Sequence, residues 1–270
     1  MLSAPVPATV IQNMLLQYRE YGLPVSGYPS LLFLHGLFGC AMNWHSIARH
    51  FEPDWHVIVP DLRNHGRSPH GAETGYEAMA GDVLSLMDQL GLDRVIPIGH
   101  SMGGKVALTL AQQRPQAVER LVLADIAPVA YDNDFADIIA AFRAVVLDQL
   151  RTREEADRAM SVHIANPAIR QYLLQNLEQK QGQWRWRINL EGLALSIDQI
   201  DGFAPGCTRA YTGPSLIIRG ERSDYVLPVH EPMIRQCLPA VHIETLSGVG
   251  HWVYAEDPQG FIRLLSGFLG

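Results

Sequence analysis

A serine at position 101 has the surroundings of a nucleophile that attacks carbonyl groups. The sequence Gly99-His100-Ser101-Met102-Gly103 follows an apolar stretch, 95–98, and leads into a helical stretch, 105–113. A serine on so tight a turn between strand and helix stands exposed at the carboxyl end of the strand. Side chains at Gly99 and Gly103 would collide with the neighbouring strand and helix, so both glycines are steric requirements. The alternative is an ordinary serine in a glycine-rich turn.

Such a serine needs a base, and His251 is the candidate. It follows the stretch 241–246 through a flexible Ser-Gly-Val-Gly loop, which would reach the same edge of a parallel sheet as Ser101. The remaining histidines carry no such motif; His65, for example, lies in a turn where a surface or loop-fixing role is expected.

The acid that would orient His251 has two candidates. The usual place is the loop after 215–218, where common spacing puts the acid at 223, but Ser223 stands there and Asp224 comes one residue later. Asp125, at the end of the stretch 121–124, opens on the same rim. We favour Asp125 over Asp224, with Ser223 as a hydrogen-bonding neighbour of the imidazole. The alternative for Asp125 is a helix or loop cap.

The loop after 31–35 should supply part of an oxyanion site. Gly36 allows close approach of the backbone, so the amide of Leu37 would face the amide of Met102. The pocket around these amides is expected to have apolar walls. Its candidate side chains, for each of which ordinary core packing is the alternative, are Leu37, Phe38, Met102, Tyr225 and Trp252.

Alternating strand-like and helix-like stretches predict the elements that position these residues. They indicate an α/β protein with a mostly parallel, twisted sheet covered by helices on both faces. Between about 132 and 203 the stretches are helical, with no strand pattern, which predicts a cap over the site. We expect a first core part at 1–128, a cap at 129–205 and a second core part at 206–270. Expected strands are 15–23, 31–35, 56–60, 95–98, 121–124, 215–218 and 241–246; expected helices include 41–51, 76–90, 227–238 and 260–269.

Composition excludes several classes of protein. A chain of 270 residues with a net charge of -7 and no basic run argues against a polyanion-binding surface such as one for nucleic acid. Three cysteines at unrelated spacings indicate neither a disulfide framework nor a metal site, and no histidine pair has metal-ligand spacing. The N-terminal stretch 1–16 lacks the charged front of a signal peptide, and no apolar run is long enough to cross a bilayer. These observations predict a cytoplasmic protein.

Five motifs together resemble the α/β-hydrolase superfamily. They are LHGLFG at 34–39, DLRNHGRS at 61–68, GHSMGGK at 99–105, DIAP at 125–128 and GHWV at 250–253. Within the superfamily they are most similar to YbfF-like bacterial esterases and abhydrolase-domain 11 proteins. This resemblance implies a helical cap inserted after the sixth strand, with the acid after that strand and a serine in the usual acid loop; Asp125 and Ser223 match these two positions. The chain departs from the pattern in carrying Asp224 directly after Ser223.

The motifs and the resemblance together predict a serine carboxylesterase that cleaves short to medium acyl esters through an acyl-serine intermediate. A thioesterase or a C–C bond hydrolase uses the same scaffold, and a binding module without catalytic activity is the alternative from another class. An acyl-CoA or dienone substrate would call for cationic anchors. The candidates are Arg143, Arg151, Arg185 and Arg187, for which a place on a solvated helix surface is the favoured alternative. We expect a small-molecule ester as partner, no cofactor, no metal, no nucleic acid or membrane partner, and a monomer or homodimer.

Overall fold

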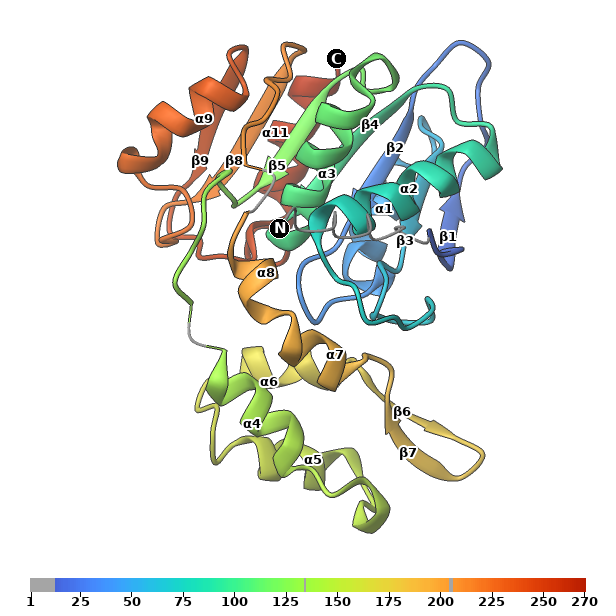
Figure 1. Cartoon of the computed structure of the whole chain (residues 1–270), viewed down its shortest axis with the longest axis vertical. Coiled ribbons are helices and arrows are strands. Elements are labelled where there is room, and N and C mark those ends of the chain that lie inside the picture. Colours follow the sequence, from blue (N-terminus) through green and yellow to red (C-terminus); the bar gives the residue numbers. More distant parts are fainter. Residues whose placement is uncertain (1–12, 134, 204–205) are drawn as a thin grey trace, which may run out of the picture.

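A seven-stranded sheet forms the centre of the molecule. The computed structural model describes residues 13–133, 135–203 and 206–270. The strand order is β1-β3-β2-β4-β5-β8-β9 (Figure 1), and all neighbours run parallel except β1, which is antiparallel to β3. The predicted α/β class and mostly parallel sheet are therefore confirmed. The strands are β1 Tyr18–Tyr21, β2 Ser30–Leu34, β3 Val57–Pro60, β4 Val95–His100, β5 Leu121–Ala124, β8 Ser215–Gly220 and β9 Val241–Leu246.

Helices cover both faces of the sheet because its central strands are apolar on both sides. Every residue of β2 through β5 is buried, as expected for a parallel sheet between two helical layers. Along β2, Leu32 and Leu34 pack in the core with α2 and α3, whereas Leu31 and Phe33 pack in the opposite core with α1 and α11. The core helices are η1 Ala41–Trp44, α1 His45–Phe51, α2 Tyr76–Leu90, α3 Met102–Gln113, η2 Pro115–Ala117, η4 Pro228–His230, α9 Glu231–Cys237, α10 Val253–Glu256 and α11 Pro258–Leu269.

A mostly helical insert separates β5 from β8 and stands beside the sheet (Figure 1). Its elements are α4 Ala136–Ala144, η3 Leu147–Gln149, α5 Arg153–Met160, α6 Pro167–Leu174, β6 Leu177–Lys180, β7 Gln183–Trp186, α7 Leu190–Leu195 and α8 Ile197–Asp201. The insert follows β5, the fifth strand in chain order within the described residues, whereas the resemblance implied an insert after the sixth.

The expectation that the insert contains helices alone was wrong for one segment. Strands β6 and β7 pair antiparallel, so 177–186 is a β-hairpin. Its turn residues, Gln181 and Gly182, both have positive φ, 52° and 82°, which is the backbone of a type I′ turn. That turn is usually marked by Asn-Gly or Asp-Gly, and the weaker Gln-Gly signal explains why the hairpin was missed.

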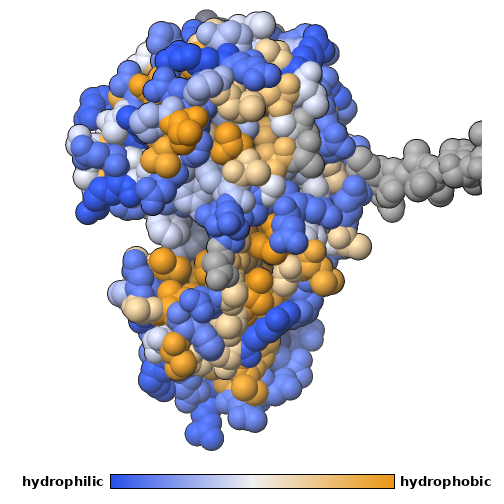
Figure 2. All heavy atoms as spheres, turned by 60° about the vertical axis from the view of Figure 1, so that its left-hand side comes forward, coloured by the Kyte–Doolittle hydropathy of each residue, from blue (hydrophilic) through white to orange (hydrophobic). Residues whose placement is uncertain are grey.

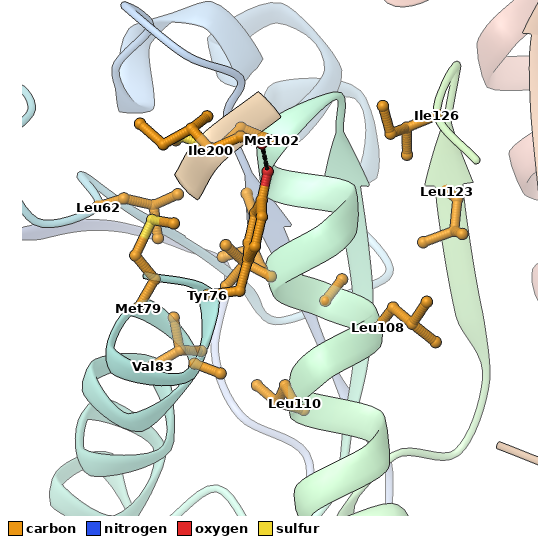
Figure 3. Close-up of a cluster of buried hydrophobic side chains, with 14 of the residues drawn as sticks. Leu62, Tyr76, Met79, Val83, Met102, Leu108, Leu110, Leu123, Ile126 and Ile200 are labelled. Carbon is orange, nitrogen blue, oxygen red and sulfur yellow. Dashed lines mark hydrogen bonds between the residues drawn. The ribbon is translucent and has the colours of Figure 1, made fainter. Parts of the chain in front are cut away.

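Buried contacts join the insert to the core at the start of α2 and α3. Figure 3 shows Tyr76 standing between these helices among apolar side chains that include Met79, Val83 and Met102. Its hydroxyl donates a hydrogen bond to the carbonyl of Ile200, at the end of the insert. Tyr76 thereby fixes the point at which the chain returns from the insert.

Two expectations drawn from composition have different outcomes. Cys207 and Cys237 form a disulfide, with Cα atoms 5.3 Å apart, although the cysteine spacing indicated no disulfide framework; Cys40 is free and buried. Sequence spacing did not show the pairing because the two cysteines, 30 residues apart, are brought together by tertiary packing. No helix in the described ranges is long and apolar enough to cross a membrane. The prediction that the stretch 1–16 is not a signal peptide rests partly on residues 1–12, which lie outside the described residues.

Candidate active site

Ser101 occupies a sharp turn between β4 and α3. Its φ of 52° lies in the left-handed region, which is strained for a residue with a side chain. A Cβ atom at Gly99 would collide with the carbonyl of Gly103, and one at Gly103 would collide with the carbonyl of Leu34. The steric requirement predicted for both glycines is therefore confirmed. The turn holds the serine where strand and helix meet, at the amino end of the α3 dipole.

Asp125 and His251 are hydrogen-bonded at the same edge of the sheet. His251 Nδ1 lies 2.7 Å from Asp125 Oδ2, although the residues are 126 positions apart. The carboxylate is fully buried, and it also accepts hydrogen bonds from the Gly220 amide, at 2.9 Å, and from the Ser223 hydroxyl. Three donors thus compensate the buried charge and fix its orientation. With Nδ1 donating to the carboxylate, Nε2 is the ring nitrogen left to accept a proton.

The geometry separates the two acid candidates. Asp224 is exposed, and no contact of its carboxylate with His251 is found in the described part of the chain. Ser223 is buried as expected, but the prediction that it bonds the imidazole was wrong: its hydroxyl donates to Asp125 instead. Asp125 lies between the two side chains, so Ser223 acts on the imidazole only through the carboxylate.

Two neighbouring residues, Tyr225 and His100, also position His251. The Tyr225 ring stacks on it with ring centroids 3.9 Å apart and an interplanar angle of 20°. His100 Nε2 donates to the backbone carbonyl of His251 at 2.9 Å, and burial lowers the pKa of His100 well below its usual value, so His100 stays neutral. Among the described residues the Ser101 hydroxyl has no hydrogen-bond partner, and it lines one cavity together with His251.

The two backbone amides predicted to bind an oxyanion lie near Ser101. The amides of Leu37 and Met102 have no acceptor in the described ranges, and each lies beside a cavity that Ser101 also lines. The loop that carries Leu37 is held by His65, whose Nε2 accepts a hydrogen bond from the Phe38 amide at 3.1 Å. Phe38 itself has a φ of 58°. The loop-fixing role expected of His65 is thus what the contacts show.

The insert also holds this loop, and sequence reasoning missed both residues involved. Tyr172 donates its hydroxyl proton to the Leu37 carbonyl at 2.9 Å, and Asn176 Nδ2 donates to the Phe38 carbonyl at 2.7 Å. Both residues come from or follow α6, more than 130 positions away in sequence. No local motif marks them, because their role arises only from the packing of the insert on the core.

A cavity of about 190 Å³ opens beside Ser101 and His251, mostly between core loops and the insert. Among the predicted walls, Phe38, Tyr225 and Trp252 line it, together with Leu37. Met102 does not; it lines a separate space of about 20 Å³ next to Ser101. Apolar residues gather on the insert and along its junction with the core (Figure 2). The insert contributes apolar walls that the sequence did not reveal, namely Phe135, Ile138, Ile169 and Leu173.

The smaller space contains a buried ammonium group. Lys105 Nζ donates to the carbonyls of Asp201, at 3.1 Å, and Gly202, at 3.0 Å, and lies 4.7 Å from the centre of the Tyr131 ring. Burial lowers the pKa of Lys105 to about 7, against the opposing effect of Asp201. Lys105 therefore ties the nucleophile helix to the end of the insert.

No group of three or more His, Cys, Asp or Glu side chains suited to a metal ion occurs in the part of the chain that the structure describes.

Comparisons with known proteins identify the family of this chain. The sequence model of the alpha/beta hydrolase fold family matches residues 29–258. The chain is 41% identical over 249 residues to the mouse "sn-1-specific diacylglycerol lipase ABHD11", covering 89% of this chain and 81% of the relative. It is 33% identical over 240 residues to "Esterase YbfF" of Escherichia coli K12, covering 88% of this chain and 92% of the relative. A solved structure titled "Marine microorganism esterase" superposes with a TM-score of 0.90 at 37% identity, covering 95% of this chain and 100% of that one. The chain belongs to the alpha/beta hydrolase family and is a carboxylic ester hydrolase of the esterase and lipase type.

Proposed function

We propose that the protein is a serine carboxylesterase in which Ser101, His251 and Asp125 form the catalytic triad. The observation that carries this proposal is the buried carboxylate of Asp125, 2.7 Å from His251 on a cavity that Ser101 shares. A buried, fully bonded carboxylate holds the imidazole in one tautomer and stabilises the imidazolium that forms during the reaction.

The reaction follows from this arrangement. His251 Nε2 removes the proton of Ser101 while the serine oxygen attacks the ester carbonyl. The amides of Leu37 and Met102 bind the oxyanion, each lowering the barrier by about 3 kcal/mol. The imidazolium then protonates the leaving alcohol, and the same nitrogen activates the water that releases the acid from Ser101.

The cavity supports short to medium acyl chains. Its volume of about 190 Å³ lies below the roughly 300–1,000 Å³ of sites for drug-sized ligands. The walls from the insert are apolar, so the insert acts as a cap that sets chain length and excludes water. The division into core 1–128, cap 129–205 and core 206–270 belongs to this proposal, as does a cytoplasmic location.

Thioester or C–C bond hydrolysis remains the second candidate on this scaffold. The same triad serves these reactions, so the substrate alone distinguishes them. The apolar cavity walls favour an alkyl acyl group, in agreement with relatives named as an esterase and a diacylglycerol lipase. A binding module without activity would not need a carboxylate aligned on His251.

Labelling and hydrolysis test the proposal together. A fluorophosphonate probe should add one label at Ser101, identified by peptide mass spectrometry, and p-nitrophenyl butyrate should be hydrolysed. Ser101→Ala should abolish both, whereas Ser161→Ala, an exposed serine in the insert, should change neither. Hydrolysis that survives in folded Ser101→Ala protein would refute the serine mechanism. A butyryl thioester cleaved much faster than the butyrate ester would favour the second candidate.

A further inference from the structure

A second, larger cleft lies outside the proposed active site. It has a volume of about 560 Å³ and separates the core loop after β3 from the hairpin of the insert. Figure 1 shows the hairpin β6 and β7 projecting from the insert beneath that loop. We name this space the hairpin cleft; its lining residues are Gly66, Arg67, Ser68, His70, Glu178, Gln179, Lys180, Arg185, Trp186 and Arg187.

The hairpin cleft is basic in a protein whose net charge is -7. Arginine and lysine supply four of its lining side chains, and a single carboxylate, that of Glu178, opposes them. Glu178 is occupied by ion pairs with Arg185 and, at 4.0 Å, with Arg187. The side chains of Arg67 and Lys180 have no acidic partner within the described ranges. Positive charge therefore remains available inside the cleft.

Arg187 carries an unused donor at this site. Its Nε is buried and has no hydrogen-bond acceptor among the described residues, and the Glu178 oxygen 4.0 Å away is beyond hydrogen-bonding distance. One terminal nitrogen of the same guanidinium donates to the Gln175 carbonyl. A buried donor without an acceptor costs free energy, which an anionic ligand would recover.

We infer that the hairpin cleft binds a phosphate ester of nucleotide size. Arginine presents a planar fork of donors that fits phosphate oxygens, so Arg67 and Arg187 would hold the phosphate. Trp186, which lines the cleft and packs edge-on against Phe142 with centroids 4.9 Å apart, offers an aromatic surface for a planar base. A volume of about 560 Å³ accommodates both parts.

The concave shape favours a soluble phosphate ester over a lipid surface. The cationic side chains line two opposing walls, one from the core and one from the hairpin, rather than one convex face. A membrane presents a broad layer of headgroups that would contact only the rim of such a cleft.

Hydrogen bonds connect the hairpin cleft to the loop of the proposed oxyanion site. The Arg187 amide donates to the Asn176 carbonyl at 2.8 Å, and the Asn176 side chain donates to the Phe38 carbonyl at 2.7 Å. A ligand on Arg187 would therefore sit two hydrogen bonds from the loop that carries the Leu37 amide. The ligand is inferred from the cleft alone, so this inference does not depend on the proposed esterase activity.

Calorimetric titration of the full chain with ADP at low salt tests the inference. ADP should bind, and Arg67→Ala and Lys180→Ala should each weaken binding about tenfold, the effect of losing about 1.4 kcal/mol of charge-assisted hydrogen bonding. Arg143→Ala is the matched control, because this exposed insert arginine pairs with Glu191 away from the cleft. All variants should hydrolyse p-nitrophenyl butyrate at the wild-type rate, which separates cleft binding from catalysis.

Four results would overturn the inference. The first is no heat of binding for ADP at millimolar concentration; the second is equal weakening by Arg143→Ala and Arg67→Ala. The third is binding to phosphatidylglycerol vesicles without binding of ADP, which would identify a lipid surface. Inorganic pyrophosphate should bind more weakly than ADP, since it lacks the base; equal affinity would remove the nucleotide from the inference.

Discussion

Replacement of Asp125 by asparagine is the sharpest test of the proposed triad. The carboxylate accepts hydrogen bonds from the Gly220 amide, the Ser223 hydroxyl and His251 Nδ1. In Asp125→Asn the carbonyl oxygen would keep the bond to the fixed backbone amide, which leaves the NH₂ group facing Ser223 and His251. The serine hydroxyl can rotate and become an acceptor. The imidazole can accept at Nδ1 only in the tautomer that carries its proton on Nε2.

That tautomer cannot remove the proton of Ser101, so kcat should fall by about 10⁴, as it does in triads that lose their acid in this way. The loss corresponds to about 5 kcal/mol of barrier. The assay is p-nitrophenyl butyrate hydrolysis, with circular dichroism to confirm folding. Asp224→Asn is the control and should keep at least half of the wild-type rate, because Asp224 is exposed. Folded Asp125→Asn protein with more than a tenth of wild-type kcat, or a comparable loss in Asp224→Asn, would refute the assignment.

Three further variants test other parts of the structure. Asp82→Ala leaves Arg63 without the partner that its Nε bonds at 2.6 Å in the core, so urea unfolding should show a loss of about 3–5 kcal/mol; a loss below about 1 kcal/mol would contradict a buried ion pair. His65→Phe removes the acceptor of the Phe38 amide, so kcat should fall about tenfold with little change in KM, and His65→Gln should restore part of it; a change in KM alone would argue against a positioning role. Burial lowers the pKa of Lys105 from 10.5 to about 7 in the folded protein. Between pH 7 and 10.5 this side chain is therefore protonated in the unfolded chain but largely unprotonated in the folded one. The free energy of unfolding should therefore rise with pH from 7 toward 9, and Lys105→Met should flatten that slope; an unchanged slope would show that Lys105 is not the group responsible.

Local patterns were sufficient for most core elements. The predicted strand 121–124 and helix 76–90 coincide with β5 and α2, because hydrophobic runs and periodicity there agree with the final burial. The turn at Ser101 was predictable because the Gly-x-Ser-x-Gly pattern stands between an apolar strand and a helix. The contacts that require its glycines come from α3 for Gly99 and from the end of β2 for Gly103. The hairpin at 177–186 was missed because its turn carries only the weak Gln-Gly signal and half of its strand residues are exposed.

The acid of the proposed triad could not be predicted from the local sequence pattern alone. Sequence spacing left Asp125 and Asp224 both open, since each follows a strand that ends at the same edge. Strand order supports Asp125 in the proposed triad: β5 pairs with β8, which brings Asp125 beside Gly220 and Ser223, while Asp224 is exposed.

The sequence by itself determined the groups available for chemistry: a serine on a strained turn, a histidine after a glycine-rich loop, acids at strand ends and the glycine-rich loop of the proposed oxyanion site. Each of these features depends on a stretch of a few residues, because local backbone sterics decide which residues such a turn or loop can contain. Tertiary structure alone decided which groups meet. It placed Tyr172 and Asn176 of the insert on the oxyanion loop, joined Cys207 to Cys237, and collected scattered basic residues into one cleft. Such contacts join residues far apart in the chain, and their formation depends on how the whole insert packs, which no local pattern records.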